Sequence, residues 1–517
     1  MADYILVGAG SAGCVLANRL TENPDATVLL LEAGGRDDNP EIRIPARWSN
    51  LLETPLDWCY RTEPQVHLNN RILTLNRGKV LGGSSSINAM VYIRGHRWDY
   101  DHWAQLGAAG WSYAEVLPYF KKAENQERGP DDNHGVGGPL NISSVPQVSP
   151  IADVFIQACA QWGLPVNDDF NGATQEGVGW YQVTQKNGER HSTVDAYLKP
   201  ALSRPNLAVE TQAHVTRLLF SGTRAVGVEY VQQGQTKQAY ADQEVILCGG
   251  AINSPQILLC SGVGPANQLR RLNLPVVVNL PGVGENFQDH PKVDCHFTSR
   301  PPTKADFSLS GAVYGEYQRN RSGLLSRVRS PVGAFAKTHP DLDIPDVQYY
   351  AAQGDINGLY DFAIVASLLR PESHGTLTLR SADPFVYPRI QPDFLASDKD
   401  LRVLVESVKF VRQLVQMPAY ADFLDGEINP TSDICTAAHI ANWIRASLES
   451  TWHCVGTCNM GVDPMAVVTP QLQVIGVENL RVVDASIMPE VVGGNTNAAV
   501  IMIAEKAADI IRSAVGE

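Results

Sequence analysis

The stretch that decides the fold is Tyr4-Ile-Leu-Val-Gly-Ala-Gly-Ser-Ala-Gly13, close to the start of the chain. Its first four residues form an apolar run with the length of a buried parallel strand. Gly8, Gly10 and Gly13 follow in the pattern GxGxxG, and residues 14–22 are typical of an amphipathic helix. In a dinucleotide site the first glycine allows a tight turn, the second lets a pyrophosphate approach the backbone, and the third lets the helix pack on the strand. The helix N-terminus adds N–H donors for the phosphates.

A second strand and an acidic residue complete this pattern. Thr27–Leu31 is again apolar and leads to Glu32, 19 residues beyond Gly13, where a carboxylate can accept hydrogen bonds from a ribose diol. The order of strand, glycines, helix, strand and acid predicts a dinucleotide site and disfavours NADP, whereas FAD and NAD both fit this motif. The residues expected to bind the cofactor here are Gly8, Gly10, Ser11, Ala12, Gly13, Glu32 and Ala33.

The composition is that of a large, acidic globular protein. The 517 residues include 41 Lys and Arg against 55 Asp and Glu, a net charge of −14, which argues against a nucleic-acid-binding surface. None of the nine cysteines forms a CxxC pair, so neither a zinc site nor a disulfide framework is indicated. We expect no targeting segment at Met1, and no apolar run reaches the length of about 18 residues that a membrane helix needs. A cytoplasmic protein without stable membrane insertion is therefore expected.

Strand-like runs between residues 205 and 290, and again near the C-terminus, predict that the dinucleotide-binding part is discontinuous. The strands predicted for it are 207–209, 215–220, 225–231, 245–248 and 479–483, and the helices are 254–260, capped by Asn253, and 497–512. Alternating runs from about residue 295 to 465 predict an antiparallel sheet with helices around it. Its predicted strands are 347–350, 362–367 and 375–379, and its helices are 398–415 and 437–448.

Five further segments carry a resemblance to a known family. They are 77–88 (RGKVLGGSSSIN), 249–265 (GGAINSPQILLCSGVGP), 281–291 (PGVGENFQDHP), 453–461 (HCVGTCNMG) and 482–497, which contains VVDASIMP and GGNTN. With the N-terminal stretch they resemble, in order, the signatures of the glucose–methanol–choline (GMC) family of FAD-dependent oxidoreductases, from residue 3 to about 512. The overall pattern is most similar to choline dehydrogenase-like and alcohol oxidase-like members.

The resemblance implies an α/β fold with two domains. One is an FAD-binding, Rossmann-like domain of the glutathione-reductase type, and the other is an α+β substrate domain with an antiparallel sheet flanked by helices. The expected FAD-binding domain consists of residues 1–150, 205–295 and 466–517, and the expected substrate domain of residues 151–204 and 296–465.

The resemblance also implies that the dinucleotide is FAD. Further residues expected to bind it are Gly83, Ser84, Asn88, Val215, Trp452, Asp484, Ala485 and Asn497. Trp452 is also expected to form an aromatic wall of the substrate pocket. Some members tether FAD covalently through a histidine just before the asparagine of the first signature. Here that position is Ile87, which cannot form such a bond, so we expect FAD to be dissociable.

Catalytic roles follow from the resemblance as well. His453 is implied to be the base, a task that suits imidazole because its ordinary pKa of ~6.5 leaves a neutral base at working pH. Asn497 is implied to be its partner, orienting the substrate oxygen and stabilising the forming alkoxide. His290 is expected to be structural, and Cys454 is expected to pack where relatives often have proline. No metal is expected, since no fourth-ligand pattern accompanies His453, Cys454 and Cys458.

These assignments predict oxidation of a primary alcohol to the aldehyde by hydride transfer to flavin. An uncharged alcohol is favoured over choline because no glutamate lies near Pro331, where choline-using relatives tend to carry one. Choline dehydrogenase is the first alternative, followed by a photodecarboxylase or hydroxynitrile lyase of the same fold and by a flavoprotein that only binds. The expected partners are a small alcohol and either oxygen or another electron acceptor, and the expected assembly is a monomer or a small homo-oligomer.

Overall fold

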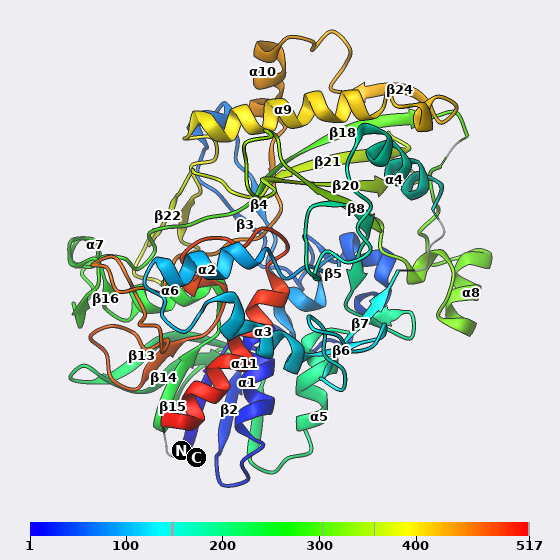
Figure 1. Cartoon of the computed structure of the whole chain (residues 1–517). Coiled ribbons are helices and arrows are strands. Elements are labelled where there is room, and N and C mark those ends of the chain that lie inside the picture. The colour runs from blue at the N-terminus through cyan, green and yellow to red at the C-terminus, as the bar shows by residue number, and fades with distance from the viewer. Residues whose placement is uncertain (146–148, 302, 356, 515–517) are drawn as a thin grey trace.

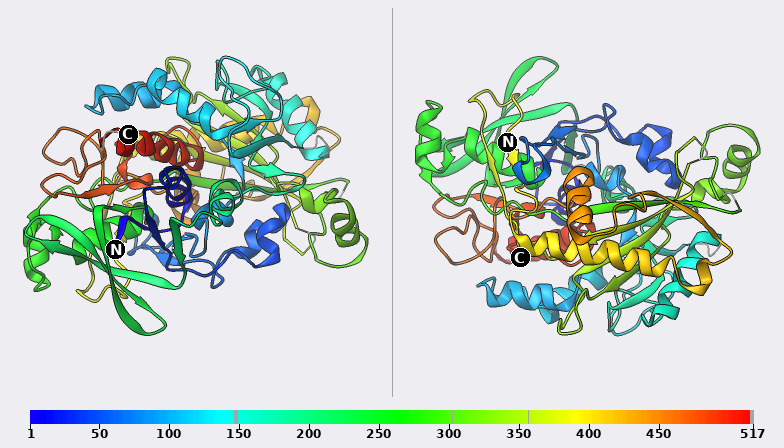
Figure 2. Two further views of the ribbon diagram at one scale, coloured as in Figure 1. Left: turned by 90° about the horizontal axis from the view of Figure 1, so that it is seen from below. Right: turned by 90° about the horizontal axis from the view of Figure 1, so that it is seen from above.

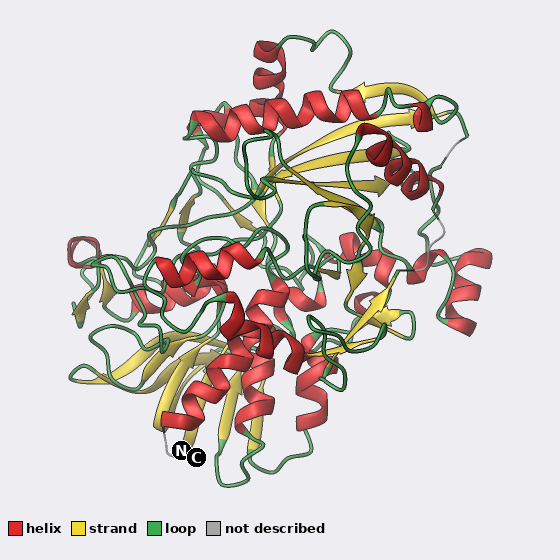
Figure 3. Cartoon of the chain, viewed as in Figure 1, coloured by secondary structure: helices red, strands yellow, loops and turns green. Residues whose placement is uncertain are grey.

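The computed structural model of the chain describes residues 1–514 except 146–148, 302 and 356. Two large β-sheets organise it, one in the lower and one in the upper part of Figure 1, and Figure 3 shows the helices that surround them. Within the described residues, no helix combines the length and the hydropathy needed to cross a lipid bilayer.

The first sheet joins strands that lie far apart in the sequence. Its order is β12-β2-β1-β15-β14-β13, with β26 also paired to β15. The strands are β1 (Ala2–Val7), β2 (Val28–Leu31), β12 (Leu207–Glu210), β13 (Ala213–Ser221), β14 (Arg224–Gln232), β15 (Gln235–Leu247) and β26 (Leu480–Val482). β12, β2, β1 and β26 run parallel to one another and to the second half of β15, whereas β13, β14 and the first half of β15 are antiparallel. The apolar β1 and β2 are largely buried, as is usual for central parallel strands.

Helix α1 (Ser11–Leu20) begins just after β1 and contacts both the first sheet and the C-terminal helix α11 (Asn497–Ala514). Two glycines make this packing feasible. Gly8 has φ of +101°, a conformation that favours glycine. A Cβ on Gly13 would lie 1.9 Å from the Gly8 carbonyl oxygen. The strand–turn–helix unit predicted from the opening stretch is therefore confirmed.

The second sheet is antiparallel and has the order β24-β18-β21-β20-β19-β8, with β25 also paired to β18. The strands are β8 (Gly177–Trp180), β18 (Pro291–Ser299), β19 (Val332–Ala336), β20 (Val347–Gln353), β21 (Phe362–Leu368), β24 (Leu424–Asn429) and β25 (Glu449–Ser450). Helices α4 (Pro150–Trp162), α9 (Asp398–Leu414) and α10 (Ala437–Ser447) share a buried apolar cluster with it. Figure 2 shows α9 and α10 covering this side in the view from above.

Shorter elements complete the chain. The remaining α-helices are α2 (Arg97–Gln105), α3 (Tyr113–Ala123), α5 (Lys199–Ala201), α6 (Gly250–Cys260), α7 (Ala266–Arg271) and α8 (Gly311–Asn320). The remaining strands are β3 (Tyr60–Arg61), β4 (Thr74–Leu75), β5 (Val91–Tyr92), β6 (Glu124–Gln126), β7 (Leu140–Ser144), β9 (Gln182–Val183), β10 (Gln185–Lys186), β11 (Glu189–Arg190), β16 (Val263–Gly264), β17 (Val278–Asn279), β22 (Thr376–Thr378) and β23 (Arg389–Gln391).

Two details differ from the sequence prediction. Helix α6 begins at Gly250, because the Asp484 carboxylate accepts from the Gly250 N–H at 2.8 Å and so satisfies the helix start. Asn253 therefore lies inside α6, where its amide donates to the Tyr60 hydroxyl instead of capping the helix. The run at 375–379 forms β22, which pairs with β23 outside the large antiparallel sheet.

Candidate active site

A cavity of about 500 Å³ lies between the two sheets. One wall consists of the carboxyl ends of β1, β2 and β15 and the turns that follow them, which is where ligands of such sheets bind. The opposite wall is one face of β18, β20 and β21. The residues predicted from sequence that line the cavity are Gly8, Gly10, Ser11, Ala12, Glu32, Ala33, Gly83, Ser84, Asn88, Val215, Trp452, His453, Asp484, Ala485 and Asn497.

The turn after β1 and the start of α6 present bare backbone to the cavity. A Cβ on Gly10 would have the Cys248 carbonyl oxygen, 4.0 Å away, as its nearest neighbour, and one on Gly250 would meet nothing within 4 Å. No side chain caps the start of α1, so its first N–H groups are available to an anion. This wall therefore fits the pyrophosphate of a dinucleotide.

Glu32 lies at the end of β2, where the sequence predicts the ribose contact. Its Oε2 accepts from the Ala9 N–H at 2.8 Å and its Oε1 from the Gly34 N–H at 2.7 Å. Burial raises the pKa of Glu32 to about 7, although these two hydrogen bonds oppose the rise. A ribose diol would donate further hydrogen bonds to the carboxylate and favour its ionised form, so the site fits an adenosine ribose.

Three of the residues predicted to bind the cofactor also hold parts of the protein together. Gly13 does not line the cavity, and its role is the close packing of α1 on β1. The Asp484 carboxylate accepts from the Gly250 N–H and from the Ser254 hydroxyl at 2.6 Å. The Asn88 amide oxygen accepts from Arg190 at 2.7 Å. Asp484 and Asn88 thus shape the cavity wall, and their contact with a cofactor stays a prediction.

A short strand pairing brings two histidines together. β25 pairs with the start of β18, so the residues just outside this pairing are neighbours. The Thr451 N–H donates to the His290 carbonyl at 3.0 Å. The buried carboxylate of Asp289 accepts from the backbone N–H of His290 at 2.8 Å and from that of His453 at 2.7 Å. Asp289 therefore fixes the backbone of both histidines.

The surroundings of His453 define its tautomer. The Thr451 hydroxyl donates to the His290 carbonyl at 2.9 Å, so its oxygen accepts from Nδ1 of His453, which is 3.0 Å away. Nδ1 of His290, 3.0 Å from the same atom, is a second acceptor. Nδ1 of His453 therefore carries the hydrogen and Nε2 carries the lone pair. The Asn495 amide donates to Nε2 at 3.2 Å.

The partner of His453 differs from the one that the sequence predicts. Asn495 contacts Nε2 of His453, whereas the Asn497 amide oxygen accepts from the Ser11 hydroxyl at 2.6 Å, beside the glycine turn. In the structure the ring of His453 therefore contacts Asn495 and not the predicted Asn497. The physical reason is the start of α11 at Asn497, which directs this side chain towards α1. Both asparagines belong to the segment Gly493–Asn497, and which of them holds the substrate oxygen stays a prediction.

His290 was expected to be structural, yet it lies in direct contact with His453. Burial lowers the pKa of His290 to about 4, so the ring is neutral and its Nδ1 can accept a hydrogen bond. Burial is the largest cause that holds the pKa of His453 well below its ordinary value, and repulsion from the charge of Arg77, and from His290 when that ring is protonated, lowers it further. Both rings are therefore uncharged near neutral pH, and Nε2 of His453 is available as a base.

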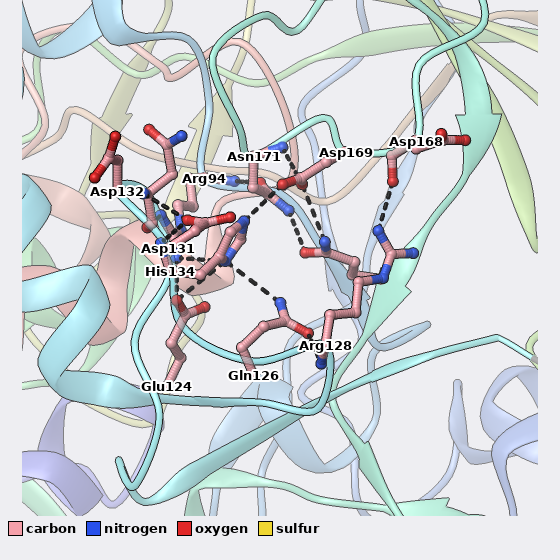
Figure 4. Close-up of polar contacts among 12 residues, drawn as sticks. Arg94, Glu124, Gln126, Arg128, Asp131, Asp132, His134, Asp168, Asp169 and Asn171 are labelled. Atoms are coloured by element: carbon pink, nitrogen blue, oxygen red, sulfur yellow. Dashed lines mark hydrogen bonds and ion pairs between the residues drawn. The ribbon is translucent and has the colours of Figure 1, made fainter.

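A second polar cluster lies away from the cavity and is drawn in Figure 4. Both ring nitrogens of His134 face carboxylates, Glu124 at 3.1 Å and Asp169 at 2.7 Å, and Arg94 pairs with Glu124 at 2.6 Å. Burial opposes a charge on His134, but the hydrogen bonds to Asp169 and Glu124 outweigh it and raise the pKa of His134 to about 9. Asp131, His134 and Asp169 are close enough to share an ion, yet an imidazolium offers no lone pair to a metal. We assign this cluster a structural role.

The chain matches one family over most of its length. Residues 2–292 match the N-terminal model and residues 371–504 the C-terminal model of GMC oxidoreductases. The mitochondrial choline dehydrogenase of Mus musculus is 45% identical, over 98% of this chain and 89% of its own. The alcohol dehydrogenase (acceptor) of Pseudomonas putida is 44% identical, over 99% of this chain and 96% of its own. A structure of Aspergillus oryzae formate oxidase, solved in work on its FAD modification, has a TM-score of 0.93 at 27% identity and covers 99% of this chain and 98% of its own.

Proposed function

Because the chain belongs to the GMC oxidoreductase family of FAD-dependent enzymes that act on CH–OH groups, we propose that it oxidises a primary alcohol to the aldehyde with His453 as the base. The observation that carries this proposal is the position of Nε2 of His453 in the cavity wall, 3.2 Å from the Asn495 amide, because the contacts of Nδ1 assign the lone pair to Nε2. Oxidation of an alcohol needs a proton acceptor at the hydroxyl group and a hydride acceptor at the carbon that bears it.

FAD, when bound, supplies the hydride acceptor. His453 takes the hydroxyl proton on Nε2, while Nδ1–H stays hydrogen-bonded to Thr451 and His290 and so keeps the ring in one orientation. The Asn495 amide donates to the substrate oxygen and stabilises the negative charge that develops there. Asp289 holds the backbone of both histidines, which pre-organises the base before substrate arrives.

We propose that FAD is held along the first wall without a covalent bond. The start of α1 and Gly10 would bind its pyrophosphate, and Glu32 its adenosine ribose. Ile87 lines the same cavity and carries no nucleophilic atom. Acid precipitation of the FAD-loaded protein should leave the yellow colour in the supernatant, and a yellow pellet would contradict non-covalent binding.

Choline is the second candidate substrate. The mouse relative is a choline dehydrogenase, and the rings of Trp48 and Trp452 lie 6.2 Å apart in the cavity wall. A trimethylammonium group can bind to such aromatic faces, and a free carboxylate would attract it further. The carboxylate of Asp294 in this wall is already paired with Lys292 at 2.7 Å, and Lys292 lines the cavity as well. We therefore favour an alcohol without a positive charge.

The test is an anaerobic titration of the FAD-loaded protein with a panel of alcohols that includes choline. We expect primary alcohols without a positive charge to bleach the flavin absorbance faster than choline at equal concentration. Bleaching by choline alone would move the assignment to the second candidate, and no bleaching by any alcohol would contradict alcohol oxidation. Admitting oxygen afterwards distinguishes an oxidase, whose flavin colour returns at once, from a dehydrogenase that needs another acceptor.

The cellular location and the assembly belong to the same proposal. The acidic composition, with a net charge of −14, supports a cytoplasmic protein. We propose that it is a monomer or a small homo-oligomer. Cell fractionation and size-exclusion chromatography coupled to light scattering test these two statements.

A further inference from the structure

The second sheet turns a polar face towards the cavity. Lys292 and Asp294 of β18 and Tyr350 of β20 line the cavity, as do the smaller side chains of Ala363 and Val365 on β21. Because neighbouring positions on a strand face opposite sides, the intervening residues join the apolar cluster beneath α9. The small residues leave space along this face, so a substrate held at His453 can extend over it.

The charges of Lys292 and Asp294 compensate each other. The Lys292 ammonium group donates to both carboxylate oxygens of Asp294, at 2.7 and 2.8 Å. The half-exposed carboxylate of Glu449 lies 3.1 Å from the same ammonium group. This part of the wall therefore offers hydrogen-bonding groups and no uncompensated positive charge.

Arg329 is different, because it lines the same cavity without a carboxylate partner. Its guanidinium group lies 4.6 Å from the centre of the Phe307 ring, and its Nη1 donates to the Ser49 hydroxyl at 3.1 Å. Among the described residues, no carboxylate oxygen lies within 4.0 Å of its nitrogens, and the carboxylate of Asp355 acts on its charge only from a greater distance. A guanidinium group has five N–H donors and stays charged in proteins, so Arg329 can bind an anion that enters the cavity.

Arg329 and His453 lie towards different ends of the cavity. Gln348 contacts Asn495 at 3.5 Å, whereas the Gln353 N–H donates to the Arg329 carbonyl at 3.0 Å. Both glutamines belong to β20, where five residues at ~3.3 Å each correspond to about 16 Å of strand. From this separation of the Arg329 backbone and Asn495 along β20, we infer that a molecule reaching from the base to the guanidinium group is elongated.

We propose that the substrate is an elongated primary alcohol with a carboxylate at the end away from the hydroxyl group, and that Arg329 binds this carboxylate. The proposal rests on the proposed alcohol oxidation. A planar guanidinium group matches a carboxylate with two parallel hydrogen bonds, which gives the contact both strength and direction. The net positive charge that Arg329 adds to the cavity also disfavours a quaternary ammonium substrate.

The first experiment compares ω-hydroxy alkanoates with α,ω-diols of the same chain length, each at constant ionic strength. The FAD-loaded wild-type protein should show a kcat/KM for the hydroxy acid about tenfold or more above that for the diol, because a charge-assisted hydrogen bond contributes to binding. A diol that reacts as well as or better than the acid would overturn the proposal. Reduction of the flavin by the diol is also the check on alcohol oxidation itself. If neither compound reduces the flavin, the proposed function fails rather than the role of Arg329.

The second experiment uses the variants Arg329→Gln and Arg321→Gln. Arg321 pairs with Glu189 on the surface and does not line the cavity, so it is the matched control. We expect Arg329→Gln to lower the ratio of the two kcat/KM values about tenfold to hundredfold, and Arg321→Gln to preserve the ratio. An unchanged ratio in Arg329→Gln would refute the assignment.

A binding measurement keeps the proposal testable if Arg329→Gln does not fold. Alkanoates without the hydroxyl group cannot react, and they should compete with the diol in the wild-type protein. Inhibition that is competitive with the diol and weakens with rising salt concentration is the expected result. Absence of inhibition, or equal inhibition by the corresponding uncharged amide, would overturn the proposal.

Discussion

The two asparagines of the segment Gly493–Asn497 offer a direct test of the site, because they have different neighbours. Asn495 contacts the base His453, whereas Asn497 contacts Ser11 in the turn assigned to the cofactor. We predict that Asn495→Ala slows flavin reduction and leaves FAD bound. We predict that Asn497→Ala weakens FAD binding and has a much smaller effect on the reduction step.

The magnitudes follow from the hydrogen bonds that each change removes. Asn495 supplies one donor for the oxygen on which charge develops, and removal of such a donor lowers kcat by about 10²- to 10³-fold. The Asn497 amide oxygen accepts one neutral hydrogen bond from Ser11, at 2.6 Å. A bond of this kind contributes about 1 kcal/mol to the order of this turn. Because the turn is assigned to FAD, we expect its loss to raise the dissociation constant of FAD by roughly fivefold at most.

The assay is stopped-flow reduction of the flavin under anaerobic conditions, with the alcohol that performs best in the titration. FAD affinity is measured separately, from the flavin that each variant retains on dialysis. A variant pair with the opposite pattern, in which Asn497→Ala loses the reduction step and Asn495→Ala reacts normally, would refute the assignment and restore Asn497 as the partner of His453.

Three further predictions concern pH and packing. Burial holds the pKa of His453 well below its ordinary value. The rate of flavin reduction should therefore be constant above pH ~6.5 and fall only as the pH drops through the lowered pKa of His453 in the folded protein. A rate that still rises above pH ~6.5 would contradict a neutral base. Burial lowers the pKa of His290 to about 4 in the folded protein, against ~6.5 when unfolded, so its contribution to stability is complete above the unfolded value and is lost as the pH falls towards 4, by about 3 kcal/mol in all. Burial lowers the pKa of His191 and His214 to about 4 as well, so urea unfolding of the wild-type protein and of His290→Asn at several pH values measures the part that belongs to His290. An equal pH dependence in the two proteins would contradict this contribution. A Cβ at Gly13 would lie 1.9 Å from the Gly8 carbonyl oxygen, so Gly13→Ala should lower the free energy of unfolding by about 1–3 kcal/mol or abolish folding. The control Gly35→Ala, where a Cβ meets nothing within 4 Å, should leave the free energy of unfolding almost unchanged. Equal effects of the two substitutions would contradict the packing role of Gly13.

The sequence predicts the strand–turn–helix unit well because its signals are local. The apolar run before Gly8, the glycine spacing and the acid at Glu32 each act within a few residues of the turn, so their geometry follows from the backbone alone. Most strand segments of the first sheet were predictable for the same reason, whereas residues 235–244, the first part of β15, were not predicted. The start of α6 was not, because it depends on the Asp484 carboxylate, which comes from a distant part of the chain.

The catalytic end of the cavity depends on long-range contacts and was predicted only in part. His453 was recognised from its motif. The proximity of His290 follows from the pairing of β25 with β18, which no local pattern encodes. Asn495 and Asn497 are two residues apart, and only the start of α11 decides which of them turns to the base. Arg329 enters the cavity through the arrangement of strands and loops around β20, so its position could not be predicted from spacing.

The central claim is that His453 removes the hydroxyl proton while hydride leaves the same alcohol. Anaerobic stopped-flow reduction of His453→Ala, loaded with FAD and mixed with the preferred alcohol, tests it most directly. We predict a reduction rate about 10²- to 10⁴-fold below that of the wild-type protein, with FAD still bound and with partial recovery when imidazole is added. A variant that retains FAD and is reduced at the wild-type rate would contradict the claim.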